Sequence, residues 1–133
     1  MVKQTVFYFC PHCGNMVGMI NDGGVVPHCC GEKMTKLVAN TKDGAKEKHI
    51  PVYTAKPGCE NAVAIHVTVG STEHPMTEEH YVQWIYVQSE HGGQRKSLNP
   101  GDKPEAVFVF KNDKPIKIFE YCNLHGLYSC DIE

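Results

Sequence analysis

The sequence predicts an all-β protein in two parts: a small metal-stapled unit, followed by an antiparallel β-sandwich of about seven strands. Three observations predict this fold. Two pairs of cysteines lie within residues 1–37, a segment too short to bury much of a core. From residue 49 onward, short apolar runs alternate with turn sequences rich in Gly, Pro, Asn and Asp. No segment keeps a helical period over any length. We therefore divide the chain into the stapled unit (1–37), a linker (38–48) and the sandwich (49–133).

The stapled unit begins with a strand and its return. Residues 5–10 alternate with the period of a strand, and residues 15–20 read as the strand that returns beside it. The Asn-Asp-Gly-Gly sequence at 21–24 predicts the turn that follows. A unit of this size rarely folds without a staple, which the cysteines can supply.

The cysteines of this unit have the spacing of a metal site with four sulfur ligands. Cys10 and Cys13 form a C-x-x-C pair, and about fifteen residues later the adjacent Cys29 and Cys30 form a second pair. A glycine follows each pair and permits a tight turn. Adjacent cysteines in a regular strand point to opposite faces, so both reach one ion only through a distorted turn. Four sulfurs suit zinc or iron, and spacing alone does not decide between a structural zinc and a redox iron.

Two histidines flank these sulfurs. His12 and His28 are expected to lie outside the ligand set, because four thiolates already complete a tetrahedron.

The linker is polar, and its Asn-Thr and Asp-Gly pairs are turn signals. The runs after it predict seven strands separated by short turns, the pattern of an antiparallel sandwich. In the second of them, Val63, Ile65, Val67 and Val69 share one face. Thr77 could cap a single helical turn over 77–80. The predicted strands are 50–56, 61–69, 81–89, 94–98, 105–110, 115–122 and 126–132.

A second candidate metal site lies in the sandwich. Cys122 and His125 stand three residues apart where a predicted strand ends in a turn, so both can point at one ion. This spacing alone is a weak signal, but His49, His74 and His80 also lie in polar turns at strand boundaries, where the loops of a sandwich gather. Four imidazoles and one thiolate would leave the sixth position of an octahedral ion open, which is typical of a catalytic site. His66 and His91 are better explained as solvated side chains.

Composition limits the possible functions. The net charge of −2 argues against nucleic acid or an anionic membrane as the main partner. No apolar run approaches the roughly 20 residues of a spanning helix, and the N-terminal residues lack a secretory apolar stretch. We therefore expect a cytoplasmic protein, in which 7 cysteines and 8 histidines indicate metal chemistry more than disulfides.

These motifs, in this order and over nearly the whole chain, resemble desulfoferrodoxin, the two-iron class of superoxide reductase. The resemblance rests on the four N-terminal cysteines and on the segments Glu47–Val52, Glu73–Ile85, Pro104–Phe108 and Tyr121–Gly126. It implies a desulforedoxin-like domain with iron on Cys10, Cys13, Cys29 and Cys30, and an immunoglobulin-like sandwich with a second, reactive iron. It gives that iron four equatorial histidines and the axial thiolate of Cys122; the histidines are His49, His74, His80 and His125.

The resemblance also implies a reaction and partners. The protein would reduce superoxide to hydrogen peroxide with electrons from a rubredoxin-type donor, and it would form a homodimer. Glu47 would be able to occupy the sixth position of the oxidised iron. Cys59 and Cys130 have no role in the family pattern and are expected to be small buried hydrophobic residues.

Two further expectations come from the chemistry of the ligands. Lys48 precedes a candidate ligand, so its charge should attract superoxide and help deliver a proton through water. The backbone N–H groups of Leu124 and His125 are candidate hydrogen-bond donors to the sulfur of Cys122.

Three alternative functions use the same residues differently. A superoxide dismutase would need no external reductant and would evolve dioxygen. A copper electron carrier would also combine His and Cys on a sandwich, but it usually has a Met ligand after its last His, and no Met follows Met76 here. A zinc-stapled binding module would hold one zinc and no iron.

Overall fold

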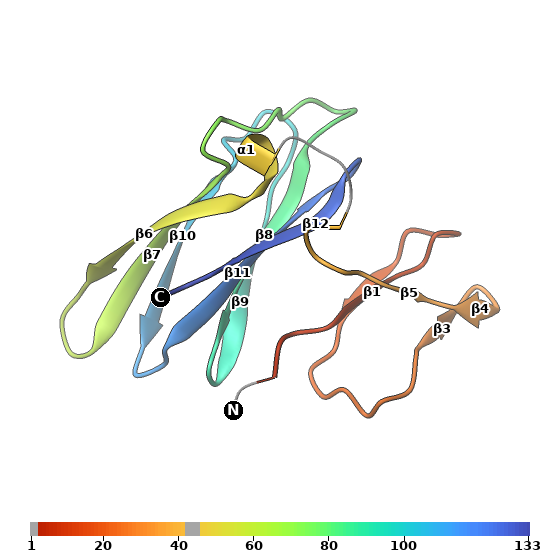
Figure 1. Ribbon diagram of the computed structural model, residues 1–133, viewed down its shortest axis with the longest axis horizontal. Helices are drawn as coiled ribbons and strands as arrows, with labels where there is room; N and C mark the ends of the chain where they lie inside the picture. The colour runs from red at the N-terminus through yellow and green to blue at the C-terminus, as the bar shows by residue number, and fades with distance from the viewer. Residues whose placement is uncertain (1–2, 42–45) are drawn as a thin grey trace. The chain divides into compact units, whose positions relative to one another are not determined.

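The computed structural model describes residues 3–41 and 46–133, which divide into two compact units, Met1–Val38 and Ala39–Glu133. Nearly all of its regular structure is β (Figure 1). Within the described ranges no helix is long and apolar enough to cross a membrane.

The first unit is a set of very short strands. β1 (Phe7–Phe9) lies between β2 (Met16–Gly18) and β5 (Thr35–Lys36), and it pairs antiparallel with both. β3 (His28–Cys29) and β4 (Glu32–Lys33) form a separate hairpin. Tyr8, Cys10 and Met34 are buried together as a small core. A core this small is far less than an independent fold normally needs, which is consistent with a unit stapled by metal.

The second unit is a seven-stranded antiparallel sandwich of the predicted kind. One sheet has the order β10-β7-β6 and the other the order β12-β11-β8-β9. Each observed strand begins and ends within two residues of the corresponding prediction. The strands are β6 (Pro51–Pro57), β7 (Ala62–Val69), β8 (Val82–Ser89), β9 (Gly92–Ser97), β10 (Glu105–Lys111), β11 (Pro115–Cys122) and β12 (Gly126–Asp131).

The sandwich is held together by one apolar core between its two sheets. The valine and isoleucine face of β7 points into it, as the alternation of that strand predicts, and Ile65 is fully buried. Phe108 on β10 and Ile85 on β8 bring side chains from both sheets into the same cluster. Burial of each such side chain contributes about 1.5–3 kcal/mol relative to exposure, so this core fixes the strand ends on which the loops are mounted.

The predicted linker contains structured residues in the part that is described. Asn40 hydrogen-bonds to β12 through its N–H to Leu127 O (2.9 Å) and through its side chain to the backbone of Ser129. Lys46–His49 form a single helical turn, α1, at the end of the sandwich where β6 begins (Figure 1). Residues 42–45 of the predicted linker lie outside the described residues.

The helical turn predicted over 77–80 is wrong. These residues form a bend that is closed twice between Thr77 and His80, by backbone hydrogen bonds and by the Thr77 hydroxyl. Thr77 therefore caps a tight loop and not a helix, because its side chain satisfies the backbone groups that a helix would otherwise use.

Candidate metal centres

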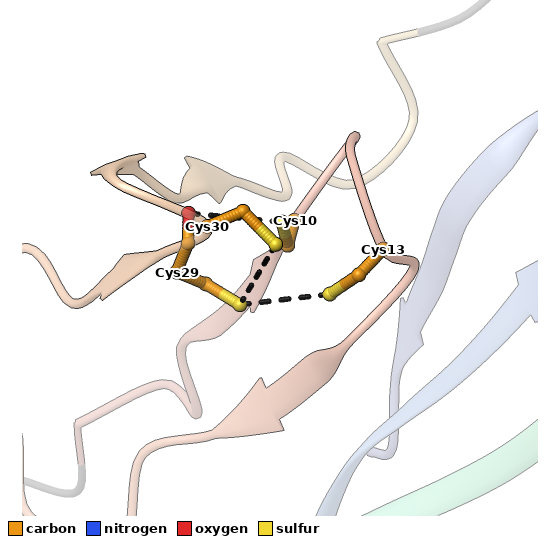
Figure 2. Close-up of side chains that lie close together, drawn as sticks. All are labelled: Cys10, Cys13, Cys29 and Cys30. Atoms are coloured by element: carbon orange, nitrogen blue, oxygen red, sulfur yellow. Dashed lines mark hydrogen bonds between the residues drawn. The ribbon is translucent and has the colours of Figure 1, made fainter.

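The four cysteines of the first unit meet in one cluster. Their sulfur atoms all lie within 4.8 Å of one another, with Cys10 and Cys13 on one loop and Cys29 and Cys30 on the other (Figure 2). The Cys13 and Cys29 sulfurs are 3.5 Å apart, and those of Cys29 and Cys30 are 4.0 Å apart. A tetrahedral ion with metal–sulfur bonds of about 2.3 Å requires sulfur separations of about 3.8 Å. The cluster therefore has the dimensions of a four-sulfur site.

Backbone turns aim these sulfurs. Gly14, with φ of 83°, donates its N–H to Cys10 O at 2.9 Å and closes the first loop. In the second loop Cys30 itself adopts a left-handed φ of 55°, followed by Gly31 at 78°. A non-glycine residue in this region is uncommon, and here it supplies the distorted turn by which adjacent cysteines reach a common point.

The hydrogen bonds of the cluster shift the pKa values of its thiols in a way that suits the binding of a cation. Backbone N–H groups, first that of Cys13 and then that of His12, help to lower the pKa of Cys10 to about 6. Hydrogen bonds with Cys13, Cys10 and Cys29 raise the pKa of Cys30 to about 12. Without a metal the sulfurs thus share protons among themselves, and a divalent ion would replace those protons.

The flanking histidines do not join the cluster. His12 pairs with Glu32, with Nε2 2.9 Å from Oε2, and His28 lies with Nδ1 3.2 Å from Val26 O. The four-sulfur cluster consists of cysteines alone among the described residues.

The second cluster lies at one end of the sandwich and gathers four imidazoles. Successive ring centroids are 4.7 Å apart for His49 and His74, 4.7 Å for His74 and His80, and 5.1 Å for His80 and His125. His125 and His49, at 4.7 Å, close the circuit. The His49–His80 diagonal is longer, at 6.3 Å. The four rings thus stand at the corners of a square.

The ligand atoms of this square are close enough for one ion. Those of His49, His74, His80 and Cys122 all lie within 4.8 Å of one another. His125 joins them, with Nδ1 3.1 Å from His49 Nε2 and 3.8 Å from Cys122 Sγ. Metal–nitrogen bonds of about 2.1 Å would put adjacent corners of a square about 3.0 Å apart, close to the His49–His125 separation.

Two buried nitrogens of the square need a partner. His74 Nδ1 is 2.7 Å from Pro75 O, a contact that requires the proton on Nδ1 and leaves a lone pair on Nε2. In the described part of the chain, His74 Nε2 and His80 Nε2 are buried without a hydrogen-bond partner. Burial, opposed by the Pro75 carbonyl and assisted by the other imidazoles, lowers the pKa of His74 to about 4. Burial therefore favours the neutral form of His74, which is the form that binds a metal.

Cys122 is the last residue of β11, and a turn follows it. The strand pairing between β8 and β11 shifts between Tyr121 and Cys122, which is a bulge of the kind often found beside functional sites. Burial raises the pKa of Cys122, and the backbone N–H groups of Leu124 and His125 oppose that rise by hydrogen-bonding to the sulfur. These are the two donors that the sequence predicts.

Glu47 and Lys48 lie exposed in α1, immediately before the buried His49. Burial lowers the pKa of His80, and the positive charge of Lys48 is among the further causes. Lys48 is therefore near enough to act on the square electrostatically.

Outside the two clusters, the predictions for four other residues have mixed outcomes. His66 is exposed and lies 3.2 Å from Glu105, and His91 is exposed in its turn, as expected. Cys130 is half-buried against the sandwich core. The expectation that Cys59 is buried is wrong, because it lies exposed in the turn between β6 and β7.

Sequence reasoning missed Glu120. This residue is fully buried on β11, and neither carboxylate oxygen has a hydrogen-bond partner in the described part of the chain. Burial raises its pKa well above the ordinary value. The sequence did contain a signal for this burial, because side chains two residues apart point to the same face of a strand. Glu120 therefore shares its face with Ile118 and Cys122.

The residues fit two metal ions. The four sulfurs match a tetrahedral site, and the square combines four imidazoles, two of them with unpartnered buried nitrogens, with the sulfur of Cys122. The two groups are consistent with two iron sites, and no residue is shared between them.

Comparison with known proteins agrees with this arrangement. Residues 41–131 match the family model described as Desulfoferrodoxin. The chain is 44% identical to a desulfoferrodoxin of Nitratidesulfovibrio vulgaris over 131 residues, 98% of this chain and 99% of the relative. It is 35% identical to a superoxide reductase of Pyrococcus horikoshii over 115 residues, 75% of this chain and 98% of the relative.

A solved structure matches both units. The superoxide reductase of Treponema pallidum is similar with a TM-score of 0.75 and 34% identity, covering 96% of this chain and 99% of that one. Since family model, full-length relatives and fold all agree with the donor sets described above, this chain belongs to the desulfoferrodoxin family.

Proposed function

We propose that this protein is a superoxide reductase, which reduces superoxide by one electron to hydrogen peroxide. The observation that carries the proposal is the square of His49, His74, His80 and His125 beside the Cys122 sulfur, with Lys48 exposed next to it. Relatives and similar structures that bear the name superoxide reductase support it.

The reaction consumes superoxide, one electron and two protons. Iron bound by the four imidazoles and Cys122 would supply the electron and be restored by an external donor. We infer iron in the four-sulfur cluster as well, because a redox ion there suits a chain that must receive electrons, whereas zinc has no redox chemistry.

Lys48 attracts the anionic substrate. Its side chain is exposed in α1, and its charge already acts on His80, so it raises the local concentration of superoxide at the square. We infer that the same ammonium group passes a proton through water to the reduced product. Glu47, its neighbour, offers a carboxylate as an exchangeable ligand for the oxidised resting form.

Backbone groups of the chain also set the electron density and the orientation of the Cys122 sulfur. Hydrogen bonds from the N–H groups of Leu124 and His125 withdraw electron density from Cys122 and fix its orientation. In haem enzymes the electron density donated by an axial thiolate favours O–O cleavage, whereas hydrogen peroxide requires that bond to survive. These two donors are therefore suited to moderate the thiolate.

The proposal includes the setting of the reaction. We expect a cytoplasmic homodimer that takes electrons from a rubredoxin-type donor and removes superoxide as a defence against oxidative stress. Neither nucleic acid nor membrane is expected as a partner.

The test is superoxide consumption by the iron-loaded chain with and without a reduced rubredoxin. A reductase consumes superoxide in proportion to donor oxidised, forms hydrogen peroxide and evolves no dioxygen. Donor-independent turnover with dioxygen release would instead show a dismutase. Metal analysis completes the test, since two irons per chain are expected and a single zinc would indicate a binding module.

A further inference from the structure

Asn15 lies just after the first cysteine loop, outside the four sulfurs, and it contacts both loops of the cluster. Its backbone N–H points to Cys13 Sγ at 3.5 Å, and its backbone oxygen accepts the N–H of Cys10 at 2.8 Å. Its side-chain Nδ2 donates to Cys29 Sγ, also at 3.5 Å. A single residue therefore joins the C-x-x-C loop to the loop of the adjacent cysteines.

The side-chain bond differs from the two backbone bonds in what it restrains. The backbone bonds of Asn15 lie within its own loop, where Gly14 already closes the turn on Cys10. Cys29 belongs to the β3–β4 hairpin, fourteen residues away. The side-chain amide of Asn15 therefore links the first cysteine loop directly to the Cys29 sulfur of the second loop.

The same bond has an electronic consequence. Four thiolates around iron give a centre whose reduced form carries one more negative charge than its oxidised form. A hydrogen-bond donor directed at a thiolate stabilises the more negative form more strongly and so raises the reduction potential. Donors to the sulfurs are among the main means by which a protein sets this potential.

We propose that Asn15 is a positioning residue of the four-sulfur centre, whose side-chain amide holds the Cys29 sulfur in place and raises the reduction potential of the iron bound there. This role is separate from superoxide chemistry at the other centre, so it is tested without superoxide.

The test uses the full chain reconstituted with iron and measures the midpoint potential of the four-sulfur centre by its absorption. Asn15→Ala removes the side-chain donor but keeps both backbone bonds, and Asn15→Asp replaces the donor by a negative charge beside Cys29. The matched control is Asn21→Asp, which makes the same change of charge in a turn of the same unit. We expect a lower potential for Asn15→Ala, a still lower one for Asn15→Asp, and the parent value for Asn21→Asp.

A second readout tests the positioning itself, namely the rate at which a chelator removes iron from the four-sulfur centre. Faster release from both Asn15 variants than from Asn21→Asp is expected, including the limit in which Asn15→Asp retains no iron while circular dichroism shows an unchanged fold. Parent potential and parent release rate in both variants would overturn the proposal. A collapse of the fold in Asn15→Ala would overturn it too, because the residue would then serve folding in general and not the sulfur.

Discussion

Gly70 sits beneath the segment that carries Glu47 and Lys48, and we expect the substitution Gly70→Ala to displace that segment. A Cβ at this position would lie 2.6 Å from Glu47 O, 2.9 Å from Ile50 O and 3.0 Å from the carbonyl carbon of Lys48. All three are backbone atoms, so no side-chain rotation relieves the contact. To reach ordinary contact at 3.4 Å, the backbone around Glu47 must move by about 0.8 Å.

The displaced atoms also hold the segment in place. Glu47 O accepts hydrogen bonds from the N–H of Thr72 at 2.8 Å and from the hydroxyl of Ser71 at 3.2 Å. Overpacking of this kind costs about 1–3 kcal/mol, and a weakened hydrogen bond adds about 1 kcal/mol. We expect Gly70→Ala to lower the free energy of unfolding of the second unit by about 2 kcal/mol.

The assay is urea unfolding followed by tryptophan fluorescence. Trp84 is the only tryptophan of the chain and lies on β8, so its emission reports the second unit alone. Gly58→Ala is the matched control, because a Cβ there would meet Ala62 Cβ at an ordinary 3.4 Å. If Gly70→Ala and Gly58→Ala unfold at the same urea concentration, the packing argument is refuted.

Three further substitutions address the reaction and the buried carboxyl group. Lys48→Ala should slow the encounter with superoxide and flatten its dependence on ionic strength, as measured by pulse radiolysis; an unchanged salt slope would remove the steering role. Glu47→Ala should leave that encounter rate intact but change the absorption spectrum of the oxidised protein, and an identical spectrum would place Glu47 outside the coordination sphere. Glu120→Gln should stabilise the protein increasingly as the pH rises above 4.5. Burial raises the pKa of Glu120 in the folded state, so the unfolded chain releases this proton first and the parent loses stability as pH rises above its ordinary pKa of 4.5. The exposed Glu90→Gln is the control in urea unfolding, and a pH-independent difference for Glu120→Gln would contradict this expectation.

The strands could be predicted because turn residues separate them, and because burial alternates along β7 as its sequence does. Every second residue of β7 is apolar and faces inward. The two ends of the observed strand lie within two residues of the expected ends. β9 begins at Gly92 although Gly92 and Gly93 read as a turn, because its pairing with β8 extends to Ser89. The local sequence does not show how far such pairing with a neighbouring strand extends.

The candidate ligands could be anticipated because a small domain has little reason other than metal binding to carry so many cysteines and histidines. Gly70 and Asn15 could not, because their importance depends on what lies opposite them in the fold. Gly70 meets the backbone of α1, and Asn15 meets the sulfur of a different loop. Each of these contacts joins residues brought together only by the tertiary fold.

The four sulfurs all come from residues before Ala39, and the imidazoles and the fifth sulfur all come from residues after it. A related chain that lacks the first unit would therefore lose one candidate metal site and keep every ligand of the second. Loss of a metal ion would also be confined to one site. A chain that loses one ion to an oxidant or a chelator would still carry a complete set of ligands for the other.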